Sequence, residues 1–75
     1  MTVLERVREY LCEHAGCDPE EVELAATLDD LNVADFEREA LSLLLTEAYE
    51  VAIPDEELFA FETVEDLVGY VEDRF

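Results

Sequence analysis

Three residues near the N-terminus, Cys12, His14 and Cys17, are of types that bind zinc. Structural zinc sites use four such ligands, usually paired at short spacing. Cys12 and His14 are two residues apart in the sequence, so on a helix their side chains point in different directions. We therefore expect no metal centre. We also expect both cysteines to be reduced thiols, whose role the sequence leaves open.

The acidic segment from Asp30 resembles a calcium-binding loop only loosely. An EF-hand loop needs carboxylates or amides at positions one, three and five, glycine at six and glutamate at twelve. Counted from Asp30, positions five and six are Ala34 and Asp35, and position twelve is Leu41. The pattern fails, so we expect only weak, non-specific binding of divalent cations.

Catalytic hydroxyls are scarce. Ser42 is the only serine, and its neighbours form no motif around it. No Ser/His/Asp or Cys/His arrangement has a supporting context, and two glycines in the whole chain leave no glycine-rich phosphate loop. The sequence therefore predicts that the protein is not an enzyme.

The charge is strongly one-sided: 22 acidic residues against four arginines and no lysine give a net charge of -18 over 75 residues. Such a polyanion repels nucleic acid and anionic membrane surfaces, and it favours a basic partner or divalent cations. A hydrophobic content of 51% is enough for a packed core. We expect a single domain over residues 1–75, and a monomer.

Neither a membrane span nor a secretion signal is expected. No apolar run approaches the roughly 20 residues that a spanning helix needs. The first residues, MTVLERVREYL, include two glutamates and contain no continuous apolar region. The sequence predicts a cytoplasmic protein.

The first expected element is a helix over about residues 3–15. Thr2 and Glu5 have the spacing of a capping box, and Gly16 is a natural stop. Its apolar residues recur at helical spacing: Leu4, Val7, Leu11 and Ala15. A long connection over residues 17–33 follows, and four apolar side chains are spaced to anchor it to the core: Val22, Leu24, Leu28 and Leu31. Structured loops of this length are often functional.

A second helix is expected over about residues 36–49, with Asp35 as its N-cap. One side should face the core through Leu41, Leu44, Leu45 and Ala48. Phe36 and Leu43 lie seven residues apart on nearly the opposite side. The acids beside them are Glu39, Glu47 and Glu50.

Pro54 ends the apolar pattern that follows, and a short helix is expected at about 55–60. Thr63 should cap the last helix, with Asp66 three residues on. The buried face of that helix is predicted to contain Val64, Leu67, Val68 and Val71. Four helices with one long loop between the first and the second predict a small all-α bundle.

Over its whole length the chain resembles the acyl carrier proteins. The shared features are the N-terminal amphipathic helix, the turn GCDPEEVE, the anchor TLDDL, the segment LLLTEAYEVAIPDEEL and the closing FETVEDLVGYVEDRF. The turn IPDEE and the ending TVEDLVGYV are fairly specific at this spacing. The resemblance implies a four-helix carrier fold with an acidic docking helix.

The family attaches a 4'-phosphopantetheine arm to a serine in an Asp-Ser-Leu motif at the start of the second helix. Alignment without a gap from Leu31 to Pro54 places Ala34, Asp35 and Phe36 on that motif, and Asn32 on the glycine before it. A shift by one residue would place Phe36 on the serine, and it also supplies no hydroxyl. We therefore expect no attachment site and no 4'-phosphopantetheine.

Three functions remain open. The first is a non-catalytic interaction protein that keeps the carrier fold and binds a basic patch of a partner, such as a carrier-dependent enzyme. Its expected contact residues are Asp35, Phe36, Glu39, Leu43, Glu47 and Glu50. The second is a genuine acyl carrier protein of fatty-acid, lipid or polyketide biosynthesis with atypical attachment. The third is a bundle that binds lipid non-covalently.

Overall fold

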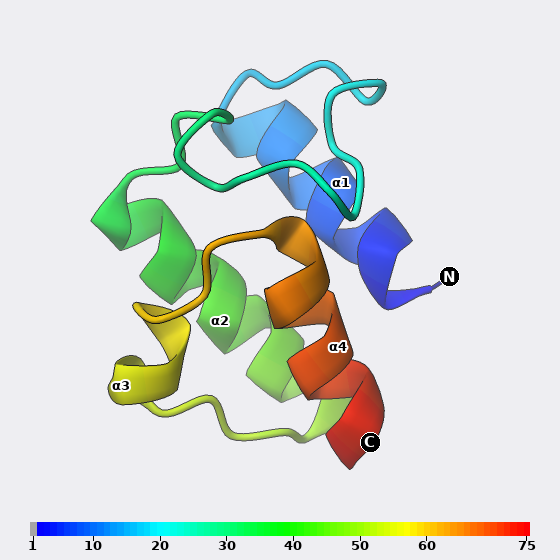
Figure 1. The fold of residues 1–75 in the computed structure, drawn as a ribbon. Coiled ribbons are helices and arrows are strands. Elements are labelled where there is room, and N and C mark those ends of the chain that lie inside the picture. The colour runs from blue at the N-terminus through cyan, green and yellow to red at the C-terminus, as the bar shows by residue number, and fades with distance from the viewer. Residues whose placement is uncertain (1) are drawn as a thin grey trace.

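The structure is a computed structural model, and it describes residues 2–75. Its helices are α1 (Val3–His14), α2 (Asp35–Tyr49), α3 (Asp55–Leu58) and α4 (Val64–Arg74). α1 packs against α4 and α2, and the short α3 packs against α2. The long connection between α1 and α2 arches over one end of the molecule (Figure 1). The expected all-α bundle with its long loop is confirmed.

Capping boxes begin α1 and α4, as the sequence predicted. The Thr2 hydroxyl accepts a hydrogen bond from the Glu5 backbone N–H at 3.1 Å, and the Glu5 carboxylate accepts one from the Thr2 N–H at 3.0 Å. At α4 the Asp66 carboxylate accepts bonds from the backbone N–H groups of Glu62 and Thr63, which hold the pKa of Asp66 below its usual value. Both helix starts are therefore fixed by local side-chain chemistry.

The end of α1 follows the expected glycine stop. Gly16 has a φ of +73°, a left-handed conformation that costs glycine nothing because it lacks a Cβ. The Cys17 N–H can then donate to the Leu11 carbonyl at 3.3 Å, which satisfies one of the last carbonyls of the helix. The chain leaves α1 towards the long loop, with the Cys17 side chain buried.

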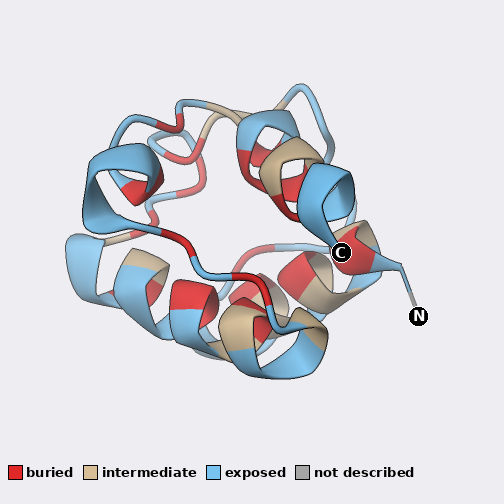
Figure 2. Ribbon diagram, turned by 90° about the horizontal axis from the view of Figure 1, so that it is seen from below, coloured by how far each residue is buried: buried red, intermediate tan, exposed pale blue. Residues whose placement is uncertain are grey.

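The core lies between the helices and beneath the long loop, with the buried residues turned inwards (Figure 2). Its fully buried large side chains are Leu11, Leu28, Leu41, Leu45, Leu58, Leu67, Val3, Val7, Val22, Val64 and Val71. The predicted buried face of α4 is confirmed, with Val68 also buried. In α1 the buried stripe is centred on Val3, Val7 and Leu11, whereas Leu4 and Ala15 are only half-buried.

The long loop is anchored by side chains and by backbone bonds to the start of α4. Val22, Leu28 and Leu31 are buried as expected, but Leu24 is 40% exposed, so its predicted role as an anchor was wrong. The backbone near Leu24 bonds to α4 instead, because the Glu65 N–H donates to the Leu24 carbonyl at 3.0 Å. Leu28 N–H also donates to the Glu62 carbonyl at 2.9 Å. These contacts hold the chain that leads into α2.

In α2 the core face differs from the expected one at its C-terminal end. Leu41 and Leu45 are fully buried and Leu44 is half-buried, but Ala48 is exposed, contrary to prediction. The buried stripe instead runs through Glu37, Leu41, Ser42 and Leu45. It is rotated towards Ser42 and away from the half-buried Leu44 and the exposed Ala48.

The third helix is shorter than the expected 55–60: α3 ends at Leu58. Phe59 closes it by donating its N–H to the Asp55 carbonyl at 2.9 Å. No helix within residues 2–75 is both long and apolar enough to cross a membrane.

Candidate functional site

The start of α2 is set by the backbone before it. Asn32 lies in the left-handed region, with a φ of 57°, which asparagine tolerates better than other residues with a side chain. Val33 is buried and Ala34 is extended, with φ −73° and ψ 162°. The Ala34 carbonyl accepts the Arg38 N–H at 3.0 Å, so the helix begins one residue later, at Asp35.

The prediction that Asp35 is the N-cap was therefore wrong. Ala34 occupies that position, and its methyl side chain cannot accept a hydrogen bond from the first turn. Asp35 is the first helical residue, and its carboxylate is exposed to solvent beside the positive end of the helix dipole. The preference of aspartate for capping therefore did not decide where the helix begins.

Glu37 supplies the cap that Ala34 cannot. Its Oε1 atom accepts a hydrogen bond from the Ala34 backbone N–H at 3.2 Å, which is one half of a capping box. The Glu37 side chain is only 8% exposed. Sequence reasoning missed this residue because the helix was expected to begin one position later. The signal was the glutamate three residues after the true N-cap.

Arg38 joins α2 to the C-terminal end of α3 and the residues that follow it. Its Nη1 atom donates to the Leu58 carbonyl at 3.1 Å and to the Phe61 carbonyl at 3.0 Å. Both carbonyls lie at or after the end of α3, where they have no partner within a helix. This contact, which sequence reasoning also missed, fixes α3 beside the first turns of α2.

One face of α2 carries apolar side chains out to solvent. Phe36 is 72% exposed and Leu43 is 60% exposed, and Ala40 between them is exposed as well. Their spacing of four and three residues places the three on one stripe. The expected acids Glu39, Glu47 and Glu50 are all exposed along the same helix and its end. We call Phe36, Ala40 and Leu43, with these three acids, the outer face of α2.

Cys17 and Ser42 are both buried and are not part of the outer face of α2. Cys17 is buried, and its thiol contacts the Leu31 carbonyl at 3.4 Å. Burial raises the pKa of that thiol, so it favours the protonated, unreactive form. Ser42 is only 8% exposed, in the middle of α2. Within residues 2–75 no three histidine, cysteine or acidic side chains are placed to hold a metal ion.

Comparison with known proteins gives the family. Residues 5–71 match the family model described as "Phosphopantetheine attachment site". The acyl carrier protein of Phenylobacterium zucineum is 37% identical over 73 residues, covering 96% of this chain and 92% of that protein. The acyl carrier protein of Streptococcus pyogenes serotype M3 is 36% identical over 74 residues, covering 99% and 97%.

The chain belongs to the acyl carrier protein family. A phosphodiester-linked arm needs a hydroxyl on the protein, but residues 31–37 of this family member contain no serine, threonine or tyrosine. The first hydroxyl along α2 is that of Ser42, which is buried. The start of α2 therefore presents no hydroxyl side chain within residues 31–37.

Proposed function

We propose that this protein is a non-catalytic interaction member of the acyl carrier protein family that carries no 4'-phosphopantetheine and binds partners through the outer face of α2. The observation that carries the proposal is the exposed carboxylate of Asp35 at the first position of α2, with no hydroxyl in residues 31–37. A carboxylate offers no hydroxyl for transfer of the arm. Its charge also repels the diphosphate of an incoming coenzyme A.

The backbone before α2 supports the alignment on which this proposal rests. Without a gap, Asn32 falls on the glycine that precedes the family's attachment motif. Asn32 has a φ of 57°, a conformation that glycine adopts most readily and asparagine next. The left-handed backbone at Asn32 is therefore consistent with a position that has glycine in the family. In the same ungapped alignment, the proposal assigns Asp35 to the position of the family's serine.

The outer face of α2 is suited to a basic partner. Exposed apolar side chains such as Phe36 and Leu43 can supply most of the binding energy when a partner buries them. The acids around them steer a basic surface towards the helix and raise the association rate. A carrier-dependent enzyme is the partner that family membership suggests.

In this proposal residues 1–75 act as one domain, a cytoplasmic monomer that catalyses no reaction and binds divalent cations weakly. Its net charge of -18 disfavours nucleic acid and anionic membrane surfaces as partners.

A genuine carrier with atypical attachment is the second candidate, and family membership favours it. Such a carrier would have to attach its arm to a hydroxyl elsewhere in the chain, because position 35 is an aspartate. Ser42 is a poor substitute, because it is only 8% exposed and lies inside a helix rather than at its start. Intact mass after treatment with coenzyme A and a phosphopantetheinyl transferase separates the two candidates, since only a carrier gains one arm.

A non-covalent lipid binder is the third candidate. Leucine and valine side chains from the helices and the long loop fill the space between the helices. A bound chain would therefore have to displace packed side chains, at a cost in stability. Native mass spectrometry of the purified chain tests this candidate: a co-purifying fatty acid or phospholipid would support it.

Partner binding is tested by capture from an extract of the native host on the immobilised chain. The matched control is the double variant Phe36→Ala with Leu43→Ala, checked for an unchanged fold by circular dichroism. The proposal expects at least one protein that the wild type retains and the variant loses, with a loss of about 1–3 kcal/mol of binding free energy per anchor. Equal retention by both chains would show that the outer face is not the docking site.

A further inference from the structure

All four arginines are engaged by uncharged groups. Arg6 donates to the Tyr49 hydroxyl at 3.1 Å, Arg8 to the Val22 carbonyl at 3.0 Å and Arg38 to two carbonyls, and Arg74 lies 3.6 Å from the centre of the Tyr70 ring. Within residues 2–75 the one ion pair joins His14 Nε2 to Glu13 at 3.9 Å. Within these residues no arginine therefore pairs with a carboxylate.

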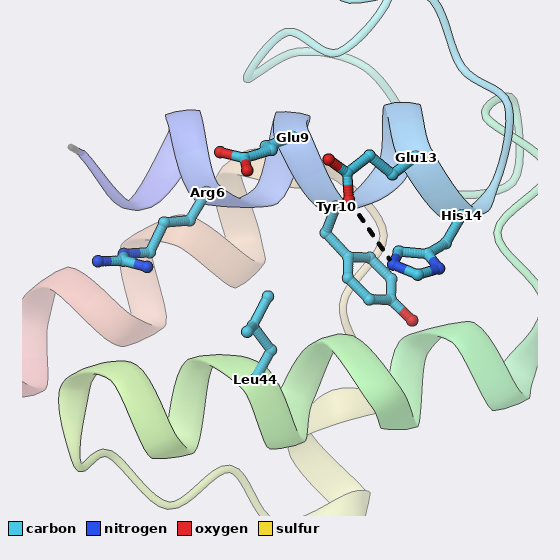
Figure 3. Close-up of a pocket in the computed structure, with 6 residues that line it drawn as sticks. All are labelled: Arg6, Glu9, Tyr10, Glu13, His14 and Leu44. Atoms are coloured by element: carbon cyan, nitrogen blue, oxygen red, sulfur yellow. Dashed lines mark ion pairs between the residues drawn. The ribbon is translucent and has the colours of Figure 1, made fainter.

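A pocket of about 260 Å³ lies in the seam between α1 and α2 (Figure 3). Its size is at the small end for ligand pockets, which suits a single side chain better than a large cofactor. Five of its lining residues come from α1 and one from α2: Arg6, Glu9, Tyr10, Glu13, His14 and Leu44. It lies apart from the start of α2 described above.

The pocket has an aromatic wall and an apolar floor. The Tyr10 and His14 rings are stacked, with centroids 4.5 Å apart and an angle of 30° between their planes. Tyr10 lies between His14 and Leu44, so one face of its ring is turned towards the pocket (Figure 3). Burial, and then the negative charge of Glu37, raises the pKa of Tyr10, so this ring stays neutral.

The rim of the pocket is acidic. Glu9 and Glu13 lie one helical turn apart along α1 and are both exposed. Arg6, the only arginine that lines the pocket, is directed towards Tyr49, with its guanidinium 5.5 Å from the centre of that ring. Within residues 2–75 no arginine pairs with either carboxylate, and Glu13 lies 3.9 Å from His14 Nε2 in the aromatic wall.

We propose that this pocket, the α1–α2 seam, receives an arginine side chain of a partner protein. A planar guanidinium can stack on the free face of Tyr10 while its N–H groups donate to Glu9 and Glu13. Leu44 packs against the aliphatic part of the arginine side chain. A lysine ammonium is a compact, strongly hydrated charge that matches such a flat wall less well. An anionic or wholly apolar group is disfavoured by the two carboxylates.

This inference deepens the proposed function, on which it rests for the source of the arginine. Leu44 follows Leu43 in the chain, so the seam flanks the outer face of α2. A basic partner seated over Phe36 and Leu43 can reach the seam with one arginine. The seam would then provide a polar binding site beside the apolar contacts of Phe36 and Leu43. It would select partners that carry an arginine at the matching position of their surface.

The test is a titration of the ¹⁵N-labelled chain with N-acetyl-arginine N-methylamide, followed by two-dimensional NMR. The matched ligand is the citrulline analogue, which has the same shape without the charge. We expect the arginine compound to shift amides from Arg6 to His14 and around Leu44, and the citrulline compound to leave them unchanged.

The variant Glu9→Gln with Glu13→Gln is expected to weaken this binding by about a hundredfold, about tenfold for each of the two charge-assisted hydrogen bonds lost. The control Glu65→Gln with Glu72→Gln removes two exposed carboxylates from α4 and should leave the affinity nearly unchanged. An equal loss in the control, equal shifts with citrulline, or shifts spread over all acidic helices would overturn the proposal. Shifts centred on Cys12 and Pro19, in the hollow on the other side of Glu9 and Glu13, would also overturn it.

The probe is designed to bind without contacting Phe36 or Leu43. Its failure would therefore leave docking through the outer face of α2 intact. Conversely, the double variant Phe36→Ala with Leu43→Ala could retain its partners. That result would contradict docking through the outer face, but it would leave the titration as a valid test of arginine binding in the α1–α2 seam.

Discussion

Glu50 is the C-cap that follows the last residue of α2, and its backbone lies in the left-handed region with φ 57° and ψ 36°. For a residue with a Cβ this conformation costs about 1–2 kcal/mol. Glu50→Gly should therefore raise the free energy of unfolding by about 0.5–1 kcal/mol, even after the greater entropy of glycine in the unfolded chain is counted. Urea denaturation measures the change.

The control for this prediction is Glu50→Gln, which removes the same charge and keeps the Cβ. If the glutamine variant is stabilised as much as the glycine variant, the gain comes from reduced negative charge. The backbone argument would then be wrong.

Phe36 and Leu43 are expected to contribute little to folding, because they are 72% and 60% exposed. Phe36→Ala and Leu43→Ala should each change the free energy of unfolding by less than about 0.5 kcal/mol. Leu45→Ala, which empties a fully buried position on the same helix, should cost about 2–5 kcal/mol. Thermal and urea unfolding of the three variants gives the comparison. A large loss in Phe36→Ala would mean that the ring belongs to the core.

Sequence patterns predicted these two exposed residues but not the start of the helix that carries them. Helical spacing alone separates Phe36 and Leu43 from Leu41 and Leu45. The N-cap lies two residues after Asn32, whose left-handed φ of 57° the sequence patterns did not predict. Local preference favoured aspartate at the cap, and tertiary structure placed alanine there.

At the scale of the elements, Arg38 holds the four-residue α3 in place through two carbonyl contacts. Arg38→Gln should lower the free energy of unfolding by about 1–3 kcal/mol, because hydrogen bonds from a charged donor are lost and partly buried carbonyls are left unpaired. It should also speed hydrogen exchange at the Phe59 amide, which closes α3.

Arg74→Gln is the matched control, since it removes the same charge from an exposed residue whose carbonyl contact is within α4. It should cost clearly less. Equal losses in the two variants would mean that positive charge, and not the link between α2 and α3, is what matters.

The helices show why part of the fold could be predicted from the sequence and part could not. The capping boxes at Thr2 and Thr63 are local signals, and both predicted helix starts are confirmed. Ala48 and Leu24 were placed in the core by spacing, yet both are exposed, because spacing does not say which neighbour covers a given side. The Arg38 contacts join residues at least 20 positions apart and have no local signature.

For the whole molecule, the net charge of -18 with no arginine–carboxylate pair in residues 2–75 means strong self-repulsion in the folded state. Added sodium chloride should raise the melting temperature, since the Debye length falls to about 8 Å at physiological ionic strength. Millimolar magnesium or calcium should raise it further than sodium chloride of equal ionic strength. Scanning calorimetry measures both effects. A melting temperature indifferent to salt and to divalent cations would contradict the expected repulsion.

The fold and family could be predicted from the whole sequence, because amphipathic spacing, the long anchored loop and the acidic composition agree with one another. The partner could not, because a docking surface is defined by shape and charge on two molecules. The α1–α2 seam also had no sequence signature, since Leu44 is 30 residues from His14 along the chain.

The central claim, that the start of α2 cannot carry the family's prosthetic group, is tested most directly by intact mass spectrometry. The purified chain is incubated with coenzyme A and a phosphopantetheinyl transferase of broad specificity. The variant Ala34→Asp with Asp35→Ser, which restores the hydroxyl and the acid before it, serves as the positive comparison. We expect the variant to gain the mass of one arm and the wild-type chain to remain unchanged. A clean gain of one arm by the wild-type chain would contradict the account.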